Sequence, residues 1–218
     1  MNLPNALTAG RIVATPLIAT LPFANSWPLR LTAFVLFVIA AVTDYVDGML
    51  ARSRKQETDL GKLLDPLADK LLLLGTFVPM YLLAPTFPFV TPVGSFGLPW
   101  WIVAIVLGRE LFMTIFRQVA ARRGVVIAAI GPAKWKTATQ LIWQGSAYFW
   151  FFAATLAAAH DWTNGAWRGF AMFNGIVGTL MMIVAVALTI YSLIVYIRNF
   201  GGIFASPSSS ETTRHRAP

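Results

Sequence analysis

The chain has 218 residues, of which 57% are hydrophobic and 12% charged, and its mean hydropathy is +0.65. Soluble domains carry about 25% charged residues, so this composition argues against a soluble protein. Cysteine is absent, which excludes disulfides, thiolate zinc sites and cysteine nucleophiles. The two histidines, His160 and His215, fall in an expected loop and in the tail, so a histidine metal site or a Ser-His dyad is not expected. The net charge of +8 comes without an aromatic-interleaved basic face, and nucleic acid is not an expected partner.

Apolar stretches near the twenty residues needed to cross hydrocarbon recur along the chain. They predict transmembrane helices over roughly 6–25, 29–52, 60–83, 101–123, 136–159 and 169–197. Four prolines make 84–100 a non-helical connection, and 124–137 is expected to be a cytoplasmic link, in part re-entrant. The predicted fold class is therefore an all-α integral membrane protein with six transmembrane helices. One transmembrane domain is expected over 1–200, followed by a disordered polar tail over 201–218.

Basic residues collect on one side of this six-span arrangement, and only Arg30 and Arg168 fall near the other side. The first group is Arg52, Arg54, Lys55, Arg117, Arg122, Arg123, Lys134, Lys136, Arg198, Arg214 and Arg216. The positive-inside rule then places both termini in the cytoplasm. An aromatic belt is expected at the opposite interface, formed by Trp27, Trp100, Trp101, Trp162 and Trp167.

An acidic segment interrupts the apolar background between the second and third spans. It holds six of the nine acidic residues: Asp44, Asp47, Glu57, Asp59, Asp65 and Asp69. Charge in an apolar background is costly, so the segment is a candidate functional site at the cytoplasmic ends of these spans. On helices, each of the pairs Asp44/Asp47 and Asp65/Asp69 lies on one face. Two facing carboxylate pairs suit hard cations such as Mg²⁺, Mn²⁺ or Ca²⁺ rather than zinc.

The segment spells D-x2-D-G-x2-A-R-x8-G-x3-D-x3-D and resembles the signature of the CDP-alcohol phosphotransferases. The resemblance implies a six-span, usually dimeric enzyme that transfers a phosphatidyl or similar group from a CDP-linked donor to an alcohol. It implies two divalent cations, Mg²⁺ or Mn²⁺, held by Asp44, Asp47, Asp65 and Asp69, with Asp69 chiefly the general base. The residues implied to meet the donor are Asp44, Asp47, Gly48, Ala51, Arg52, Thr58, Gly61 and Asp65. Arg52 is alternatively a charge that only sets topology.

Basic residues elsewhere are candidates for binding the acceptor. Arg109 and Arg117 are eight residues apart and hence near one helical face, and Arg109 lies inside an apolar run where a charge demands a partner. Lys134 and Lys136 open the fifth span on the same side as the acidic segment. These four cations would suit a phosphate group, although the two lysines are alternatively only topology charges. Arg11, inside the first span, either snorkels to the interface or belongs to the site.

Four segments resemble corresponding segments of the bacterial members of this family that use sn-glycerol 3-phosphate: NLPNALTAGRI, LLDPLADKLL, GRELFMTIFRQVAARRG and AKWKTATQ. The resemblance implies transfer of a phosphatidyl group from CDP-diacylglycerol to sn-glycerol 3-phosphate, giving phosphatidylglycerol phosphate and CMP. It implies a homodimer in a bacterial inner membrane, in contact with membrane lipids. Gly131-Pro132-Ala133 departs from relatives that carry glycine directly before the first lysine.

Two other kinds of function stay open at this stage. Within the family, a phosphatidylinositol-phosphate or cardiolipin synthase also accepts phosphate-bearing alcohols. A cation transporter would use intramembrane carboxylates, but near the bilayer midplane and with broken helices, whereas these acids cluster at one interface.

Overall fold

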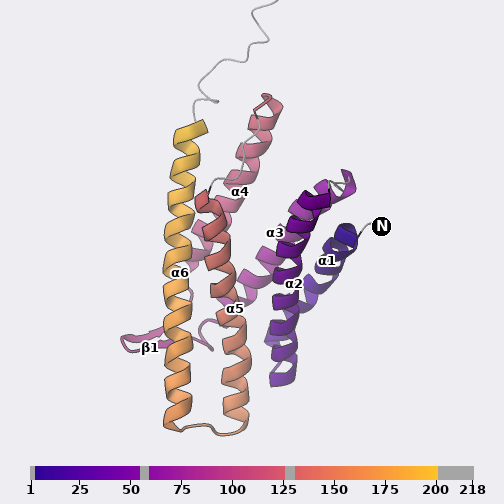
Figure 1. Ribbon diagram of the computed structural model, residues 1–218. Coiled ribbons are helices and arrows are strands. Elements are labelled where there is room, and N and C mark those ends of the chain that lie inside the picture. Colours follow the sequence, from indigo (N-terminus) through magenta and orange to yellow (C-terminus); the bar gives the residue numbers. More distant parts are fainter. Residues whose placement is uncertain (1–2, 55–58, 126–130, 201–218) are drawn as a thin grey trace, which may run out of the picture.

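The computed structural model describes residues 3–54, 59–125 and 131–200, and within them the side chains except at 3–5, 44–63, 65 and 131–134. The described part is a bundle of six α-helices with one small hairpin (Figure 1). The elements are α1 Leu3–Thr20, the 3₁₀ turn η1 Leu21–Phe23, α2 Trp27–Arg54, α3 Asp59–Leu83, β1 Phe89–Thr91, β2 Gly94–Phe96, α4 Trp100–Arg122, α5 Gly131–Ala159 and α6 Gly165–Phe200.

In Figure 1, α5 and α6 run upright side by side, and α1, α3 and α4 are inclined to them. α5 packs chiefly on α6 and α2, α1 packs on α3 and α2, and α4 leans on α6. The start of α1 and the end of α6 lie at the upper end in Figure 1, together with the α2 end that precedes α3 and the α4 end that precedes α5. The acidic and basic segments singled out in the sequence therefore meet at one end of the molecule.

Each of the six predicted spans is helical, and the largest difference is at the start of α5. This helix begins at Gly131 rather than near residue 136, so 131–135 is helix and not part of a link. Pro132 does not prevent this, because the missing N–H of proline has no helical partner in the first turn in any case. The Gly131-Pro132-Ala133 departure thus occupies a helix start.

The connection 84–100 is non-helical as expected, but it contains a short antiparallel hairpin that the sequence did not predict. Phe89 pairs with Phe96 and Thr91 with Gly94. β1 packs directly on α6, where two glycines leave the room. A Cβ on Gly178 would come within 2.5 Å of the Phe89 ring, and one on Gly175 would collide with the Val90 carbonyl. The absence of side chains at these two positions is what lets the hairpin rest on the helix.

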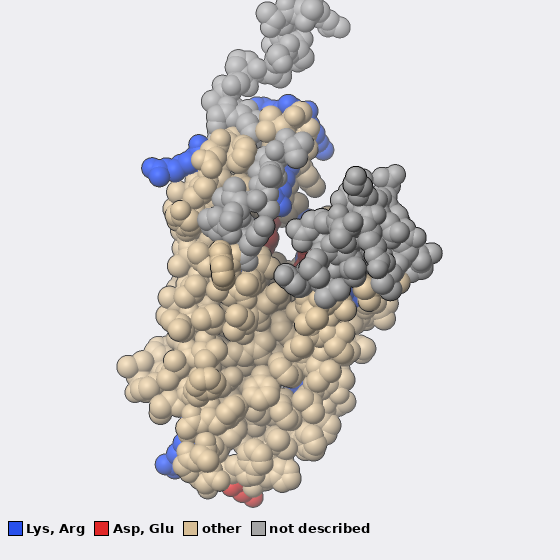
Figure 2. Space-filling model, viewed as in Figure 1, with Lys and Arg blue, Asp and Glu red and all other residues tan. Residues whose placement is uncertain are grey.

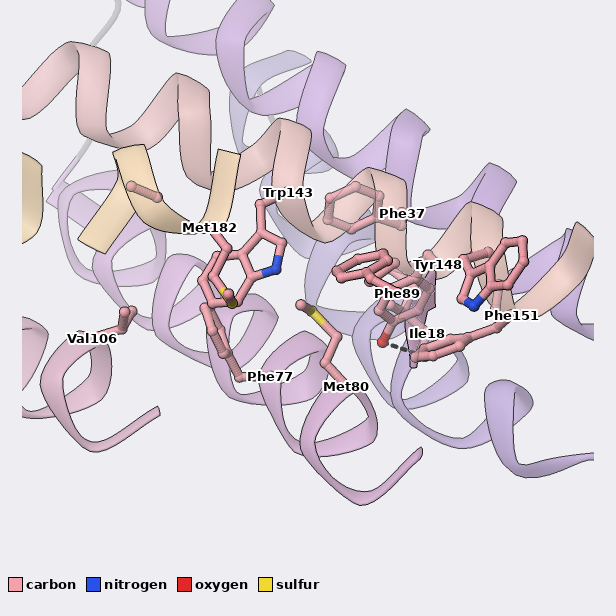
Figure 3. Close-up of a cluster of buried hydrophobic side chains, with 14 of the residues drawn as sticks. Ile18, Phe37, Phe77, Met80, Phe89, Val106, Trp143, Tyr148, Phe151 and Met182 are labelled. Atoms are coloured by element: carbon pink, nitrogen blue, oxygen red, sulfur yellow. Dashed lines mark hydrogen bonds between the residues drawn. The ribbon is translucent and has the colours of Figure 1, made fainter. Parts of the chain in front are cut away.

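The core of the bundle is aromatic and joins α1, α3 and α5 (Figure 3). The Phe77 and Trp143 rings pack edge to face with centroids 5.2 Å apart. The buried Tyr148 hydroxyl bonds the Ile18 carbonyl at 3.1 Å and the Gly75 carbonyl at 3.2 Å. These contacts fix α5 against α3 and α1.

The described helices long and apolar enough to cross a membrane lie at Ala6–Phe23, Pro66–Leu83 and Gly165–Phe200, and Trp27–Thr43 is a shorter apolar stretch. Large apolar side chains on α6, including Phe173 and Ile183, face outward, as expected where lipid is the solvent. The protein is thus mostly helical and has the character of an integral membrane protein. The count of six spans and the cytoplasmic position of the termini stay predictions.

Candidate active site

Most of the acidic signature lies outside the described side chains. α2 contains the positions of Asp44, Asp47, Gly48, Ala51 and Arg52, and α3 contains those of Gly61, Asp65 and Asp69. Of these, only the Asp69 side chain is described, and Thr58 lies outside the described residues altogether. In the described part of the chain no group of three or more acidic, histidine or cysteine side chains could hold a metal. The predicted metal site is therefore not tested by the structure.

Asp69, the predicted general base, is held by Arg11. The Arg11 Nη1 donates to Asp69 Oδ1 at 3.1 Å, across the α1–α3 contact. The Arg11 side chain is only 2% exposed, whereas that of Asp69 is 60% exposed. Arg11 does not snorkel to water, since its charged group is buried beside this carboxylate. The carboxylate is thus anchored from inside the protein while it stays open to solvent on its other side.

Arg109 and Lys136 meet at one carboxylate, that of Glu110. Arg109 Nη1 donates to Glu110 Oε1 at 2.9 Å, and Lys136 Nζ donates to the same oxygen. Arg109 Nη2 also donates to Ser192 Oγ on α6 at 3.2 Å. Both cationic side chains are 6% exposed, and a charge buried to this extent needs a partner. Glu110 and Ser192 are the partners of Arg109 that the sequence predicted it would need.

Arg117 faces the same helix as Arg109, as their spacing predicted. Its Nη2 donates to the Tyr196 hydroxyl at 3.3 Å, and its guanidinium carbon lies 5.7 Å from the centre of that ring. Ser192 and Tyr196, the partners of the two arginines, are one turn apart on α6. The Lys134 side chain lies outside the described residues.

Positive charge exceeds negative charge in this cluster. Arg109 and Arg117 both repel the Lys136 ammonium, while Glu110 attracts it. Arg109 and Lys136 thus share one described carboxylate, Arg117 adds further positive charge nearby, and the buried Nε of Arg109 has no hydrogen-bond partner among the described residues. Such a site has both charge and a donor left over for an anion.

A cavity of about 180 Å³ connects the predicted base to this cluster. It lies between α3 and α5, with α2 and α4 contributing one wall residue each. Its polar wall consists of Asp69, Lys70, Glu110, Lys136, Thr137, Gln140 and Gln144. Figure 2 shows a hollow near the upper end in which acidic atoms are visible, with Lys and Arg gathered around that end of the molecule. Asp69 and Lys136, which are 67 positions apart in the sequence, line this one cavity.

Sequence reasoning predicted Asp69 and Lys136 but missed the other five members of this polar wall. Glu110 was not predicted to bind a cation, although it is the shared partner of Arg109 and Lys136. Gln140 and Gln144 were not singled out. Their spacing of four and eight residues from Lys136 gives a polar stripe along an otherwise apolar span, and that pattern could have indicated a polar face.

The family model for CDP-alcohol phosphatidyltransferases matches residues 1–191 of the chain. This chain belongs to that family. The match covers every described element except the last turns of α6. The acidic segment and the residues Arg109, Glu110 and Lys136 therefore all fall inside it.

Individual relatives carry names from this family. The chain is 32% identical over 206 residues to the CDP-diacylglycerol–glycerol-3-phosphate 3-phosphatidyltransferase 1 of Arabidopsis thaliana, covering 91% of this chain and 62% of the relative. It is 33% identical over 206 residues to a CMP-forming cardiolipin synthase of Oryza sativa, covering 91% and 57%. It is 36% identical over 154 residues to the CDP-diacylglycerol–glycerol-3-phosphate 3-phosphatidyltransferase of Bacillus subtilis, covering 65% and 73%. The chain thus spans less than two thirds of the length of either plant relative.

Proposed function

We propose that the protein transfers the phosphatidyl group of CDP-diacylglycerol to sn-glycerol 3-phosphate and releases CMP and phosphatidylglycerol phosphate. The observation that carries the proposal is the shared cavity, which has a carboxylate suited to be a base, Asp69, at one wall and a buried cation, Lys136, at another. A volume of about 180 Å³ is below the roughly 300–1,000 Å³ typical of drug-sized ligands, so it favours a small acceptor. Relatives from a plant and a bacterium with this activity in their names support the choice.

The donor half of the reaction belongs to the acidic signature. Asp44, Asp47, Asp65 and Asp69 would hold two divalent cations, on which the family generally depends. Their oxygen-only donor set fits Mg²⁺ or Mn²⁺. The cations would neutralise charge on the donor pyrophosphate and its leaving oxygen. The small residues Gly48, Ala51 and Gly61 would admit the cytidine, and Arg52 and Thr58 would contact the nucleotide.

Asp69 would take the proton from the acceptor hydroxyl. As this proton leaves, the hydroxyl oxygen attacks the β-phosphorus of the donor, and the bond from that phosphorus to the oxygen bridging to the α-phosphorus breaks. CMP leaves with that oxygen. Arg11 fixes the direction of the Asp69 carboxylate, because it bonds one of its oxygens and is itself buried. A base held in one orientation within reach of its proton is what this step requires.

Arg109, Arg117, Lys134 and Lys136 would hold the acceptor phosphate. Arginine can make two parallel hydrogen bonds to a phosphate, and lysine adds a compact charge. Glu110 neutralises part of this charge, because one of its oxygens accepts hydrogen bonds from both Arg109 and Lys136. A phosphate entering the cavity would share the cations with Glu110 rather than find them unpaired.

The experiment is CMP release by the purified protein with CDP-diacylglycerol, Mg²⁺ or Mn²⁺, and a panel of acceptors. The panel is glycerol 3-phosphate, inositol phosphate, free inositol, serine and phosphatidylglycerol. We expect glycerol 3-phosphate to give the highest kcat/KM. No CMP release with any acceptor refutes the enzyme proposal. A preference for phosphatidylglycerol refutes the acceptor and favours cardiolipin synthesis, the second candidate, which the rice relative's name supports.

We further propose a multi-pass protein in a bacterial inner membrane, with six spans, both termini in the cytoplasm, and two copies forming a homodimer. The basic residues at the upper end of the bundle support this orientation (Figure 2). Because the chain has no cysteine, single cysteines introduced at the two ends of the bundle can be labelled one at a time. A cysteine replacing Asp161, in the exposed turn between α5 and α6, should react with an impermeant reagent only from outside the cell.

A further inference from the structure

Gln140 is a buried amide with hydrogen-bonding capacity left unused. It lies on α5, one turn after Lys136, and is 6% exposed. Its Oε1 has no hydrogen-bond partner in the described part of the protein. Buried side-chain oxygens in native proteins are nearly always bonded, so an orphan of this kind calls for an explanation.

The next polar residue on the same face behaves differently. Gln144, one turn further along α5, donates from Nε2 to Thr76 Oγ1 on α3 at 3.0 Å. Gln144 therefore has a structural partner, and it ties α3 to α5 at the base of the cavity. Gln140 lines the same cavity and is likewise buried away from water, but its Oε1 lacks such a partner among the described residues. This contrast separates a residue that braces the wall from one that is available to a ligand.

We propose that Gln140 determines acceptor specificity by bonding the secondary hydroxyl of a short polyol phosphate. The inference rests on the proposed function. It adds the residue that recognises the hydroxyl on the carbon between the phosphate and the reacting hydroxyl. Lys136, on the same helix face, would bind the phosphate, and Asp69, on the opposite wall, would accept the proton of the reacting hydroxyl. Gln140 shares their cavity and is about 6 Å along the helix from Lys136. A hydroxyl both donates and accepts, so it satisfies the amide whichever way the amide is turned.

The consequence is discrimination against acceptors that lack this hydroxyl. Such a molecule keeps its phosphate and its reacting primary hydroxyl, yet it leaves the Gln140 amide buried without a partner. Sites built to bond a hydroxyl reject the analogue without it far better than apolar pockets reject an extra group. The Gln140 amide, rather than the cations, would then discriminate glycerol 3-phosphate from an alkyl phosphate that lacks the secondary hydroxyl.

The experiment compares sn-glycerol 3-phosphate with 3-hydroxypropyl phosphate, which lacks only the secondary hydroxyl. CMP release is measured for the wild type, Gln140→Met and Gln140→Glu, with Gln144→Met as the matched control on the same helix. We expect the wild type to favour glycerol 3-phosphate in kcat/KM by about tenfold or more. Gln140→Met should lose most of this preference, because its kcat/KM should fall for glycerol 3-phosphate and change little for the analogue. Gln140→Glu keeps an acceptor atom and should keep the preference, and Gln144→Met should affect both acceptors alike.

Equal use of the two acceptors by the wild type overturns the inference, and this comparison needs no variant to fold. An unchanged preference in Gln140→Met overturns it as well, as does a preference lost equally in Gln144→Met. The proposed function fails in a different way, by the wild type releasing no CMP with glycerol 3-phosphate, and the inference then falls with it. A wild type that is active but indifferent to the secondary hydroxyl leaves the proposed function standing and removes only the role of Gln140.

Discussion

Replacing Glu110 by glutamine tests whether one carboxylate balances the acceptor site. The substitution keeps the shape of the side chain and one oxygen that can accept a hydrogen bond, but it removes the negative charge. In the wild type a single Glu110 oxygen accepts bonds from Arg109 and from Lys136. In the variant, these two buried cations face each other with no described carboxylate in contact with either.

The size of the effect follows from burial. Removing one partner of a buried ion pair costs about 3–5 kcal/mol. The Glu110 side chain is 29% exposed and the amide keeps one hydrogen bond, so we expect a smaller cost, about 2–3 kcal/mol. For a chain of this size each kcal/mol lowers Tm by about 2–4 °C, which gives a fall of about 5–10 °C.

Phosphate should reverse part of this loss. An anion in the cavity supplies the charge that the amide lacks, and binding to the folded state alone raises its stability. The assay is thermal unfolding in detergent, followed by tryptophan fluorescence, in sodium phosphate and in sodium chloride of equal ionic strength. We expect phosphate to raise the Tm of Glu110→Gln more than that of the wild type.

The matched control is Asp161→Asn, the same chemical change in an exposed turn at the other end of the bundle. Asp161 has φ 50°, a conformation that asparagine also tolerates, so this variant should unfold like the wild type. The reasoning is refuted if Glu110→Gln unfolds within about 1 °C of the wild type. It is refuted equally if phosphate stabilises both proteins to the same extent.

Four further changes probe the rest of the machinery. Asp69→Asn should lower CMP release by about 10²–10⁴-fold; near-normal turnover removes Asp69 as the base. Arg11→Gln should lower kcat by up to about 100-fold while the acceptor KM stays constant, and a rise in KM alone contradicts a positioning role. Gly175→Ala should lower Tm because its Cβ collides with the Val90 carbonyl, whereas Gly169→Ala, with nothing within 4 Å, should not; equal Tm values contradict the packing of the hairpin. Treatment with EDTA should abolish CMP release and Mg²⁺ or Mn²⁺ should restore it; activity that survives chelation argues against the metal site.

The helices could be predicted from the sequence because a chain in lipid must satisfy its backbone hydrogen bonds within each span. That requirement makes length and hydropathy sufficient to find six helices. It says little about where a helix starts once its end leaves the apolar region, and the early start of α5 at Gly131 was missed for this reason. The β1–β2 hairpin was missed because three-residue strands between prolines carry no periodic signal.

The site was predictable where a residue broke a rule of its surroundings. Arg109 in an apolar run demanded a partner, and the structure supplies Glu110 and Ser192. The pairing of Arg11 with Asp69 joins positions 58 apart, and local spacing cannot reveal which helices will be neighbours. Gln140 escaped notice because a single uncharged amide in a membrane helix breaks no rule until its missing partner is visible.

The two halves of the site are held by different parts of the bundle. α1 and α3 fix Asp69 through Arg11, and α4 and α6 fix Arg109 through Glu110 and Ser192. The packing of α3 on α5 joins the two halves about two turns deeper, where Gln144 bonds Thr76. Chemistry that needs a base and a phosphate site at a fixed separation therefore depends on a contact that touches neither substrate. Under the proposed function, the core beneath the cavity would therefore contribute to catalysis, because rigid packing passes its spacing directly to the groups above it.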